Sequence, residues 1–474
     1  MKFTLLGMET AGGRRAVACL MAIGSGLLAA CASPPTLDGA LLPSVATASA
    51  SPPSEAAPAT TPCPPGVAAF ARCLSGRDRS GAHYLIAMPT AWNGTLVVHA
   101  HGGPALGAPN PERSVEDLQR WAVVPRAGYA WAGSTFRQGG VAVRAAAEDT
   151  ERLRRIFVEQ VARPRRTILH GQSWGASVAA RAAEMAALDP RGRPAYDGVL
   201  LTSGVLGGGS RSYDFRLDLR VVYQYLCANH PRPDELAYPL WMGLPPDSAL
   251  TPAELARRVD ACLGTATPAA RRTPEQQARL KTIVDVIRIP ERSIAGHLNW
   301  ATWHFQDIVQ NRTGGKNPFG NEGVRYAGSS DDAALNVGVL RYRADPAAVA
   351  RFAADADLGG RIAVPVLTVH AVDDPTAFVE LESVFSDTMA RAGSADHLVQ
   401  TYTADREHSY LSDPVYPTLL EALLRWVDDG ARPTPERIAA RCVELQATFG
   451  PGCRFLPDYR SGPLSSRVAP RSPG

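Results

Sequence analysis

The stretch HGQSWGASVAA, from His170 to Ala180, places a serine between two glycines at the point where an apolar run gives way to alanines. The residues just before it, RTIL, are typical of a buried β-strand, and the residues after it are typical of a helix. A G-x-S-x-G pattern between a strand and a helix puts the serine, Ser173, on a sharp turn at the edge of a sheet. Alone, the same serine also fits an ordinary helix N-cap, so the rest of the chain has to distinguish the two interpretations.

Short apolar runs alternate with helical patterns on both sides of this motif. Runs such as GTLVVHAHGG (94–103), YDGVLLTSG (196–204) and PVLTVHAVDD (365–374) are nearly continuous in Val, Leu and Ile, as in a sheet covered on both faces. This alternation predicts an α/β fold with a mainly parallel central sheet and helices on both faces. Helices are predicted over 141–161, 173–187, 375–392 and 414–426, and over 114–124, where Ser114 and Asp117 have capping-box spacing.

The alternation stops after Gly204, and a Pro-, Arg- and Trp-rich segment of helical character follows. We interpret this segment as a mostly helical cap inserted into the sheet domain. The Ala/Pro/Ser/Thr-rich segment near the N-terminus predicts a flexible tether, and the Pro/Ser/Arg tail from Pro463 to Gly474 is expected to be extended or disordered. The predicted divisions are a signal peptide (1–30), a linker (31–62), a first core segment (63–206), the cap (207–360), a second core segment (361–430) and an irregular extension (431–474).

The N-terminus has the pattern of an export signal. Arg14 and Arg15 precede a short apolar run, and the run ends in Leu28-Ala29-Ala30-Cys31. These four residues resemble the lipobox of bacterial lipoproteins, which implies lipidation at Cys31 and a place in the cell envelope; plain secretion is the alternative. The net charge of +3 comes without a basic tract, so nothing suggests nucleic-acid binding.

Six cysteines remain when Cys19 in the signal and Cys31 are set aside. An exported chain enters an oxidising compartment, where an even number of cysteines favours disulfides. We predict pairing between sequence neighbours, because each pair then lies within one local segment: Cys63–Cys73, Cys227–Cys262 and Cys442–Cys453. No CxxC or HxxxH spacing supports a metal site, and no phosphate-binding glycine pattern indicates a cofactor.

At Ser173 the chain resembles the α/β-hydrolase superfamily, over about residues 82–204 and 364–426. The resemblance implies an oxyanion hole early in the chain and a triad in the order Ser, acid, His. HAHGGP (99–104) is similar to the family's oxyanion loop, so the backbone N–H groups of Gly102 or Gly103, together with that of Trp174, are expected to hold the anionic oxygen.

The remaining triad members follow from the same order. Asp374, at the end of a predicted strand and before a proline, is the expected acid, with Asp373 as the alternative. His408, in DREHSYLS after the last predicted strand, is the expected general base. Each residue also has a structural interpretation, as a helix cap, a turn residue or an exposed loop histidine. The ordered combination nevertheless favours a serine hydrolase.

The cap is expected to determine the substrate. HLNWATWHFQD (297–307) places His297, Trp300 and His304 at near-helical spacing, either as an aromatic wall over the site or as ordinary cap core. We predict a carboxylic-ester hydrolase that acts on small, aromatic or polymer-derived esters and has no nucleic-acid partner. The alternative is an exopeptidase similar to prolyl aminopeptidases, which needs a cap acid to bind the substrate amine; the candidates are Asp307, Glu322, Asp331 and Asp332. A third interpretation, a binding lipoprotein without catalysis, requires Ser173 to be unreactive.

Overall fold

A nine-stranded sheet organises the chain in the computed structural model, which describes residues 55–186 and 192–471. The predicted signal peptide, Cys31 and most of the predicted linker lie outside these residues. In spatial order the strands are β1 (Ala59–Thr61), β2 (Ala71–Arg77), β3 (His83–Pro89), β5 (Ala130–Ser134), β4 (Thr95–Ala100), β6 (Arg166–Gln172), β7 (Gly198–Thr202), β8 (Val366–Ala371) and β9 (Leu398–Thr403). The six strands from β5 to β9 are parallel, and β1, β2 and β3 pair antiparallel at one edge.

Strand side chains alternate between two hydrophobic clusters, one on each face of the sheet. In β4, Leu96 and Val98 belong to one cluster and Val97 to the other, as the two-residue period of a strand requires. The first face is covered by α3 (Val143–Gln160), α4 (Trp174–Met185) and α13 (Leu381–Arg391). The second is covered by α1 (Glu112–Arg120), α2 (Val123–Arg126) and α14 (Val415–Asp429). The predicted α/β sheet, buried on both faces, is confirmed.

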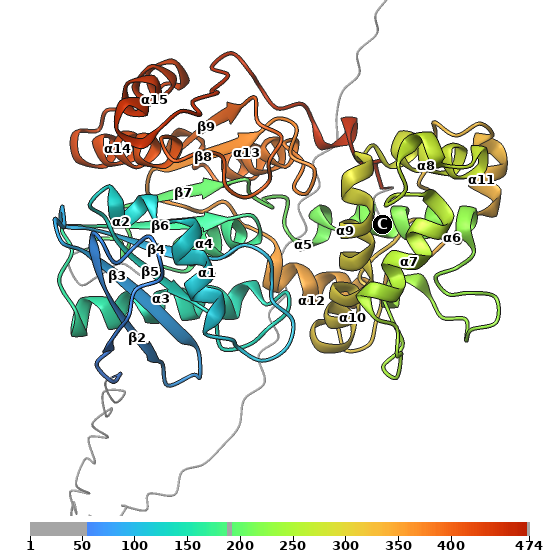
Figure 1. Ribbon diagram of the computed structural model, residues 1–474, viewed down its shortest axis with the longest axis horizontal. Helices are drawn as coiled ribbons and strands as arrows, with labels where there is room; N and C mark the ends of the chain where they lie inside the picture. Colours follow the sequence, from blue (N-terminus) through green and yellow to red (C-terminus); the bar gives the residue numbers. More distant parts are fainter. Residues whose placement is uncertain (1–54, 187–191, 472–474) are drawn as a thin grey trace, which may run out of the picture. The chain divides into compact units, whose positions relative to one another are not determined.

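Between β7 and β8 the chain forms helices and no strand within the described residues. They are α5 (Gly209–Ser212), α6 (Asp214–Cys227), α7 (Pro252–Leu263), α8 (Pro274–Ile287), α9 (Ile294–Asn299), α10 (Phe305–Asp307), α11 (Asp332–Gly338) and α12 (Pro346–Ala356). Figure 1 shows most of them gathered beside the sheet. Several begin where the sequence dictates, because a Thr or Asp side chain caps the first turn and a proline follows it, as at Thr251, Thr273 and Asp345.

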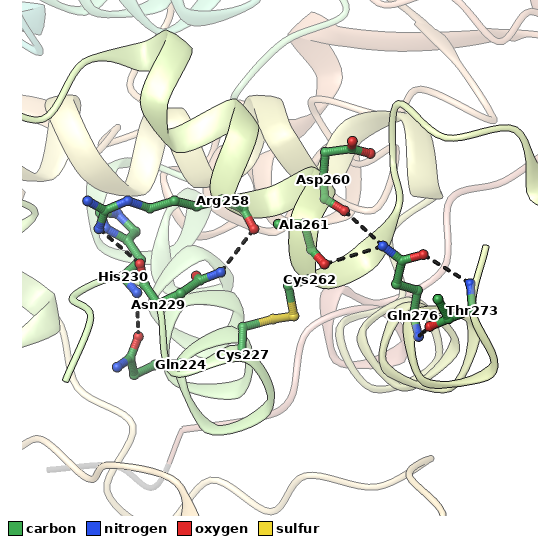
Figure 2. The surroundings of a disulfide bond; sticks show 10 residues. All are labelled: Gln224, Cys227, Asn229, His230, Arg258, Asp260, Ala261, Cys262, Thr273 and Gln276. Atoms are coloured by element: carbon green, nitrogen blue, oxygen red, sulfur yellow. Dashed lines mark hydrogen bonds between the residues drawn. A yellow bond between two sulfur atoms is a disulfide. The ribbon is translucent and has the colours of Figure 1, made fainter. Parts of the chain in front are cut away.

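Three disulfides pair the six cysteines as predicted. Figure 2 shows the Cys227–Cys262 bond, which joins the end of α6 to α7. Beside it, the Asn229 side chain donates to the Arg258 carbonyl and Arg258 Nη1 donates to the Asn229 carbonyl, at 2.9 Å each. The turn after α6 is thereby tied to α7 both covalently and by hydrogen bonds.

Three local predictions are wrong. Ser114 lies inside α1, whose N-cap is Pro111, because the helix begins before the residue that the capping-box pattern indicates. Residues 59–61 of the predicted tether form β1, which pairs with β2. The C-terminal extension is not irregular, because α15 (Pro435–Phe449) starts at a Thr434 cap and buries Ile438 and Cys442.

The C-terminal tail is ordered as far as the structure describes it, contrary to the expectation of an extended or disordered segment. Residues 464–466 form a short 3₁₀ turn, and Val468 is buried. Arg471 pairs with Asp218 of α6 at 2.8 Å. Apolar burial and this ion pair hold the tail against the cap.

Candidate active site

Ser173 occupies a strained turn between β6 and α4. Its φ of 57° and ψ of −122° lie in a region that non-glycine residues rarely adopt. Glycines flank it because there is no room for side chains: a Cβ on Gly171 would lie 2.2 Å from the Gly175 carbonyl oxygen, and one on Gly175 would lie 2.1 Å from that of Ala100. The turn therefore presents the Ser173 hydroxyl beyond the carboxyl end of the sheet.

His408 and Asp374 lie in line with that hydroxyl. His408 Nε2 is 2.7 Å from Ser173 Oγ, and His408 Nδ1 is 2.7 Å from Asp374 Oδ2. A carboxylate accepts only, so Nδ1–H donates to Asp374 and Nε2 is left to accept the serine proton. Ser173 and Asp374 are buried, while the His408 side chain is 17% exposed. The three residues predicted as a triad are brought together with the hydrogen bonds that a triad needs.

Asp374, not Asp373, is the carboxylate at His408. Asp374 Oδ1 accepts the backbone N–H groups of Thr376 at 2.7 Å and Ala377 at 3.0 Å. Burial opposes its charge, but the His408 ring and the hydrogen bonds from two histidines hold the pKa of Asp374 well below its usual range. The Asp373 side chain is 61% exposed and faces Arg406 at 3.6 Å.

A second histidine, His370, lies behind the acid and is buried. Its Nε2 is 3.0 Å from the Ala377 carbonyl oxygen and 3.4 Å from Asp374 Oδ2, and its Nδ1 is 3.1 Å from Glu382 Oε1. The other Glu382 oxygen accepts from Thr368 and Gln400. Burial disfavours the charged ring, but hydrogen bonds to Asp374 and Glu382 and the charges of both raise the pKa of His370 to about 10. His370 is therefore a buried cation between two carboxylates.

The predicted oxyanion loop lies beside the serine turn. Within the described chain, the N–H groups of Gly103 and Trp174 make no hydrogen bond, which leaves them free for an anionic oxygen. Gly103 is exposed and has a φ of 68°, whereas Gly102 is buried and a Cβ there would overlap the Gln172 side chain. Arg113 donates to the Gly102 carbonyl and to Asp117, and so fixes the loop.

The three cap residues lie at the two loops that flank Ser173. His297 Nε2 lies 2.9 Å from the carbonyl oxygen of Pro375, the residue after Asp374, and His304 Nε2 lies 3.0 Å from that of Pro104, next to the oxyanion glycines. Trp300 stacks on His304, with ring centres 4.3 Å apart, and both are partly exposed. By contrast, Phe305 stacks on Phe319 in the cap core.

Sequence reasoning did not single out His370, Glu382 or Arg113. His370 stands four residues before Asp374, in the same predicted strand segment, PVLTVHAVDD. A histidine so close to the expected acid was the sequence feature that could have indicated its role. Glu382 looks like an ordinary helix residue in the sequence. Within residues 55–186 and 192–471, no group of three His, Cys, Asp or Glu side chains is arranged to hold a metal ion.

The strand order and the serine turn between β6 and α4 together define an α/β-hydrolase fold with a helical insertion. No protein-family model matches the chain, and no curated protein sequence is significantly similar to it. Among solved structures, an esterase from Aspergillus oryzae is similar at 12% identity and a TM-score of 0.39, over 77% of this chain and 81% of that one.

Two other solved structures are similar at the same level. Feruloyl esterase B from Aspergillus oryzae has 13% identity and a TM-score of 0.39, over 80% of this chain and 88% of that one. The rice cell wall degrading esterase LipA from Xanthomonas oryzae has 12% identity and a TM-score of 0.38, over 84% of this chain and 98% of that one. Identities this low leave the activity to be argued from the site itself.

Proposed function

We propose that the protein is an exported serine hydrolase that cleaves carboxylic esters through an acyl-enzyme. The observation that carries the proposal is the strained Ser173 with His408 Nε2 at 2.7 Å and Asp374 behind the ring. A serine in an ordinary helix cap needs neither the positive φ nor the aligned histidine. The hydrogen-bonded order is that of an activated nucleophile.

In this mechanism Ser173 Oγ attacks the ester carbonyl carbon while His408 Nε2 takes the hydroxyl proton. The N–H groups of Trp174 and of Gly103 or Gly102 stabilise the resulting oxyanion. Asp374 keeps the imidazole in the required tautomer and stabilises its cation. The tetrahedral intermediate collapses, and the alcohol leaves with the proton from His408. Water then repeats the sequence on the acyl-serine and releases the carboxylic acid and free Ser173.

Each of the four cap carboxylates named for the amine site of the exopeptidase alternative already has a hydrogen-bond or ion-pair partner. Asp307 binds the Val141 N–H and pairs with Arg312, and Glu322 pairs with Arg343. Asp331 caps α11, and Asp332 accepts from Ser329. These contacts favour ester hydrolysis over capture of a free substrate amine.

Export is supported by the disulfides, which are typical of oxidising compartments. No helix among the described residues is both long and apolar enough to span a membrane. We include lipidation at Cys31 in the proposal as the means of anchoring to the cell envelope. A Cys31→Ser variant is then expected to leave the membrane fraction.

The test is labelling of the purified protein with a fluorophosphonate, followed by mass mapping of the adduct. We expect an adduct on Ser173 that Ser173→Ala and His408→Ala abolish, and hydrolysis of p-nitrophenyl acyl esters well above that of prolyl arylamides. Ser177→Ala is the matched control, because Ser177 lies one turn later in α4 and donates to the Val205 carbonyl. A folded protein without an adduct would leave only a binding role.

A further inference from the structure

Arg216, near the start of α6, is a buried cation without a counter-ion. The residue is 3% exposed, and its guanidinium carbon lies 4.6 Å from the ring centres of both Phe215 and Trp300. Nη1 donates to the Ser212 carbonyl at 3.1 Å, and Nε is buried without a partner. The nearby carboxylates of α6, Asp214 and Asp218, pair with Arg471, and no ion pair joins a carboxylate to Arg216 within the described chain. Burial lowers the pKa of Arg216 to about 10, so it stays charged at neutral pH.

Two of the three aromatic rings around Arg216, those of Phe215 and Trp300, connect it to both loops beside Ser173; the third ring, that of Tyr213, lies 5.3 Å away. The Phe215 ring contacts His297, which is bonded to the Asp374 loop through the Pro375 carbonyl. The Trp300 ring stacks on His304, which is bonded to the oxyanion loop through the Pro104 carbonyl. The guanidinium is therefore separated from each loop by two side chains.

Two other buried arginines of the cap have several oxygen partners each, whereas Arg216 has one among the described residues, the Ser212 carbonyl. Arg220, one turn later, donates to the carbonyls of Gly243 and Ala301 and to the Thr302 hydroxyl. Arg258 pairs with Glu235 and Glu254. In Arg216, Nη2 also lacks a hydrogen bond, but unlike Nε it is not sealed from solvent. One end of its guanidinium can thus still accept a ligand.

Aromatic stacking alone offsets only part of the cost of burying a charge. A carboxylate is the ligand that the planar guanidinium matches best, because it accepts two parallel N–H bonds. Since the cap residues around Arg216 contact both catalytic loops, the substrate is the molecule that can bring such a group there.

We propose that Arg216 binds a carboxylate of the substrate, so that the enzyme prefers esters carrying a free carboxylate on the acyl or the alcohol side. This inference rests on the proposed function, ester hydrolysis at Ser173, and names its substrate class.

The test compares kcat/KM within two chain-matched substrate pairs. Mono-p-nitrophenyl adipate against p-nitrophenyl hexanoate tests the acyl side, and 4-carboxyphenyl hexanoate against phenyl hexanoate tests the alcohol side. In at least one pair, we expect the wild type to favour the anionic ester by about 10- to 100-fold, the range of a charge-assisted hydrogen bond. Arg216→Met should abolish the preference and leave the neutral ester within about threefold of wild type, while Arg216→Lys retains part of it.

Arg257→Met is the matched control, because Arg257 is an exposed cap arginine, 76% accessible, that pairs with Glu254; it should keep the wild-type preference. Inhibition of the wild type by adipate, compared with inhibition by hexanoate, gives a second measurement that needs no variant; p-nitrophenyl hexanoate is the substrate in both cases.

The inference would be overturned if the wild type hydrolysed the two esters of each substrate pair at equal kcat/KM and if adipate and hexanoate inhibited it equally. Ester hydrolysis at Ser173 would still stand. An equal loss on both esters in Arg216→Met would show a structural role. Failure of the wild type on all four esters would instead count against the proposed function.

Discussion

At the scale of single residues, Asp373 and Asp374 are neighbours whose carboxylates lie in different environments. Asp374 is buried at 2.7 Å from His408, and Asp373 is exposed beside Arg406. Asp374→Asn is expected to lower kcat by about 10³- to 10⁴-fold, because an amide no longer holds the imidazole tautomer or stabilises its cation. Asp373→Asn should change kcat less than about twofold. Steady-state kinetics on one p-nitrophenyl ester measures both, and a comparable loss in the two variants would contradict the assignment.

The buried His370–Glu382 pair leads to a second residue-scale prediction. Removing one partner leaves an uncompensated buried charge, so His370→Gln or Glu382→Gln should each cost about 3–5 kcal/mol of unfolding free energy. The His370→Gln/Glu382→Gln double variant should cost less than the sum of the two. Urea unfolding of the four proteins at pH 6 gives this cycle, and additive losses would mean that the two side chains are not coupled.

The same pair predicts the direction of a pH effect. The pKa of His370 is raised from 6.5 to about 10 by its contacts with Asp374 and Glu382. Its contribution to stability is therefore complete below about pH 6.5 and is lost as the pH rises toward 10, because only the folded state keeps the proton. The unfolding free energy of the wild type should fall relative to that of the double variant between pH 6 and 9. Parallel curves would contradict a buried imidazolium.

Single residues also show where sequence reasoning ends. Ser173, His408 and an acid at the Asp373-Asp374 turn were predictable because the fold has a fixed chain order and each stands at a recognisable strand end. The choice between Asp373 and Asp374, by contrast, depends on which side chain the turn directs inward. Arg216 and Glu382 were not predictable, because an arginine or glutamate on a helix is normally solvated and only tertiary packing buries these two.

At the scale of elements, the Cys227–Cys262 bond closes the longest of the three disulfide loops, with a sequence separation of 35 against 10 and 11. In the chain-entropy picture, Cys227→Ala/Cys262→Ala should lower the unfolding free energy by about 3–4 kcal/mol. Cys63→Ala/Cys73→Ala is the matched control and should cost about 1 kcal/mol less, because its loop is shorter. Urea unfolding without reductant compares them, and a larger loss from the shorter loop would show that native packing dominates.

Elements were predictable where a strong local pattern existed. The parallel strands are continuous apolar runs, and three of the cap helices, α7, α8 and α12, start at Thr-Pro or Asp-Pro pairs. β1 was missed because three residues of an Ala/Thr/Pro segment form a strand only through pairing with β2. α15 also starts at a Thr-Pro pair, Thr434-Pro435. The sequence therefore contained a helix-start signal there, but the Pro-rich residues around it favoured an irregular segment.

At the scale of the whole molecule, burial keeps six of the ten histidines neutral. It lowers the pKa values of His99, His101, His170, His230, His297 and His304. Below about pH 6.5 the unfolded chain takes up protons at these six histidines and the folded chain does not. Protonation therefore favours the unfolded state, and the unfolding free energy that these histidines contribute is lost as the pH falls. Burial acts in the opposite direction on six acids: it raises the pKa values of Asp214 to about 7 and of Asp117 to about 6, and it also raises those of Asp149, Glu184, Asp218 and Asp355. For the six histidines alone, we expect the contribution to the unfolding free energy to decrease from pH 7 to pH 5.

The His99–His170 pair makes this prediction specific. Their Nδ1 atoms lie 3.0 Å apart across β4 and β6, so one ring must donate and the other accept, and protonating the acceptor would set two donors against each other. His99→Gln/His170→Gln removes both titrating groups while an amide on each side can still donate and accept. The double variant should take up about two fewer protons on unfolding at pH 5 to 6, seen as a shallower pH dependence of the unfolding free energy. A lower unfolding free energy of the double variant at pH 7 does not affect this test, because the test compares how steeply that free energy changes with pH. A slope equal to that of the wild type would mean that these two rings are already protonated in the folded protein, and that the buried histidines do not determine its acid sensitivity.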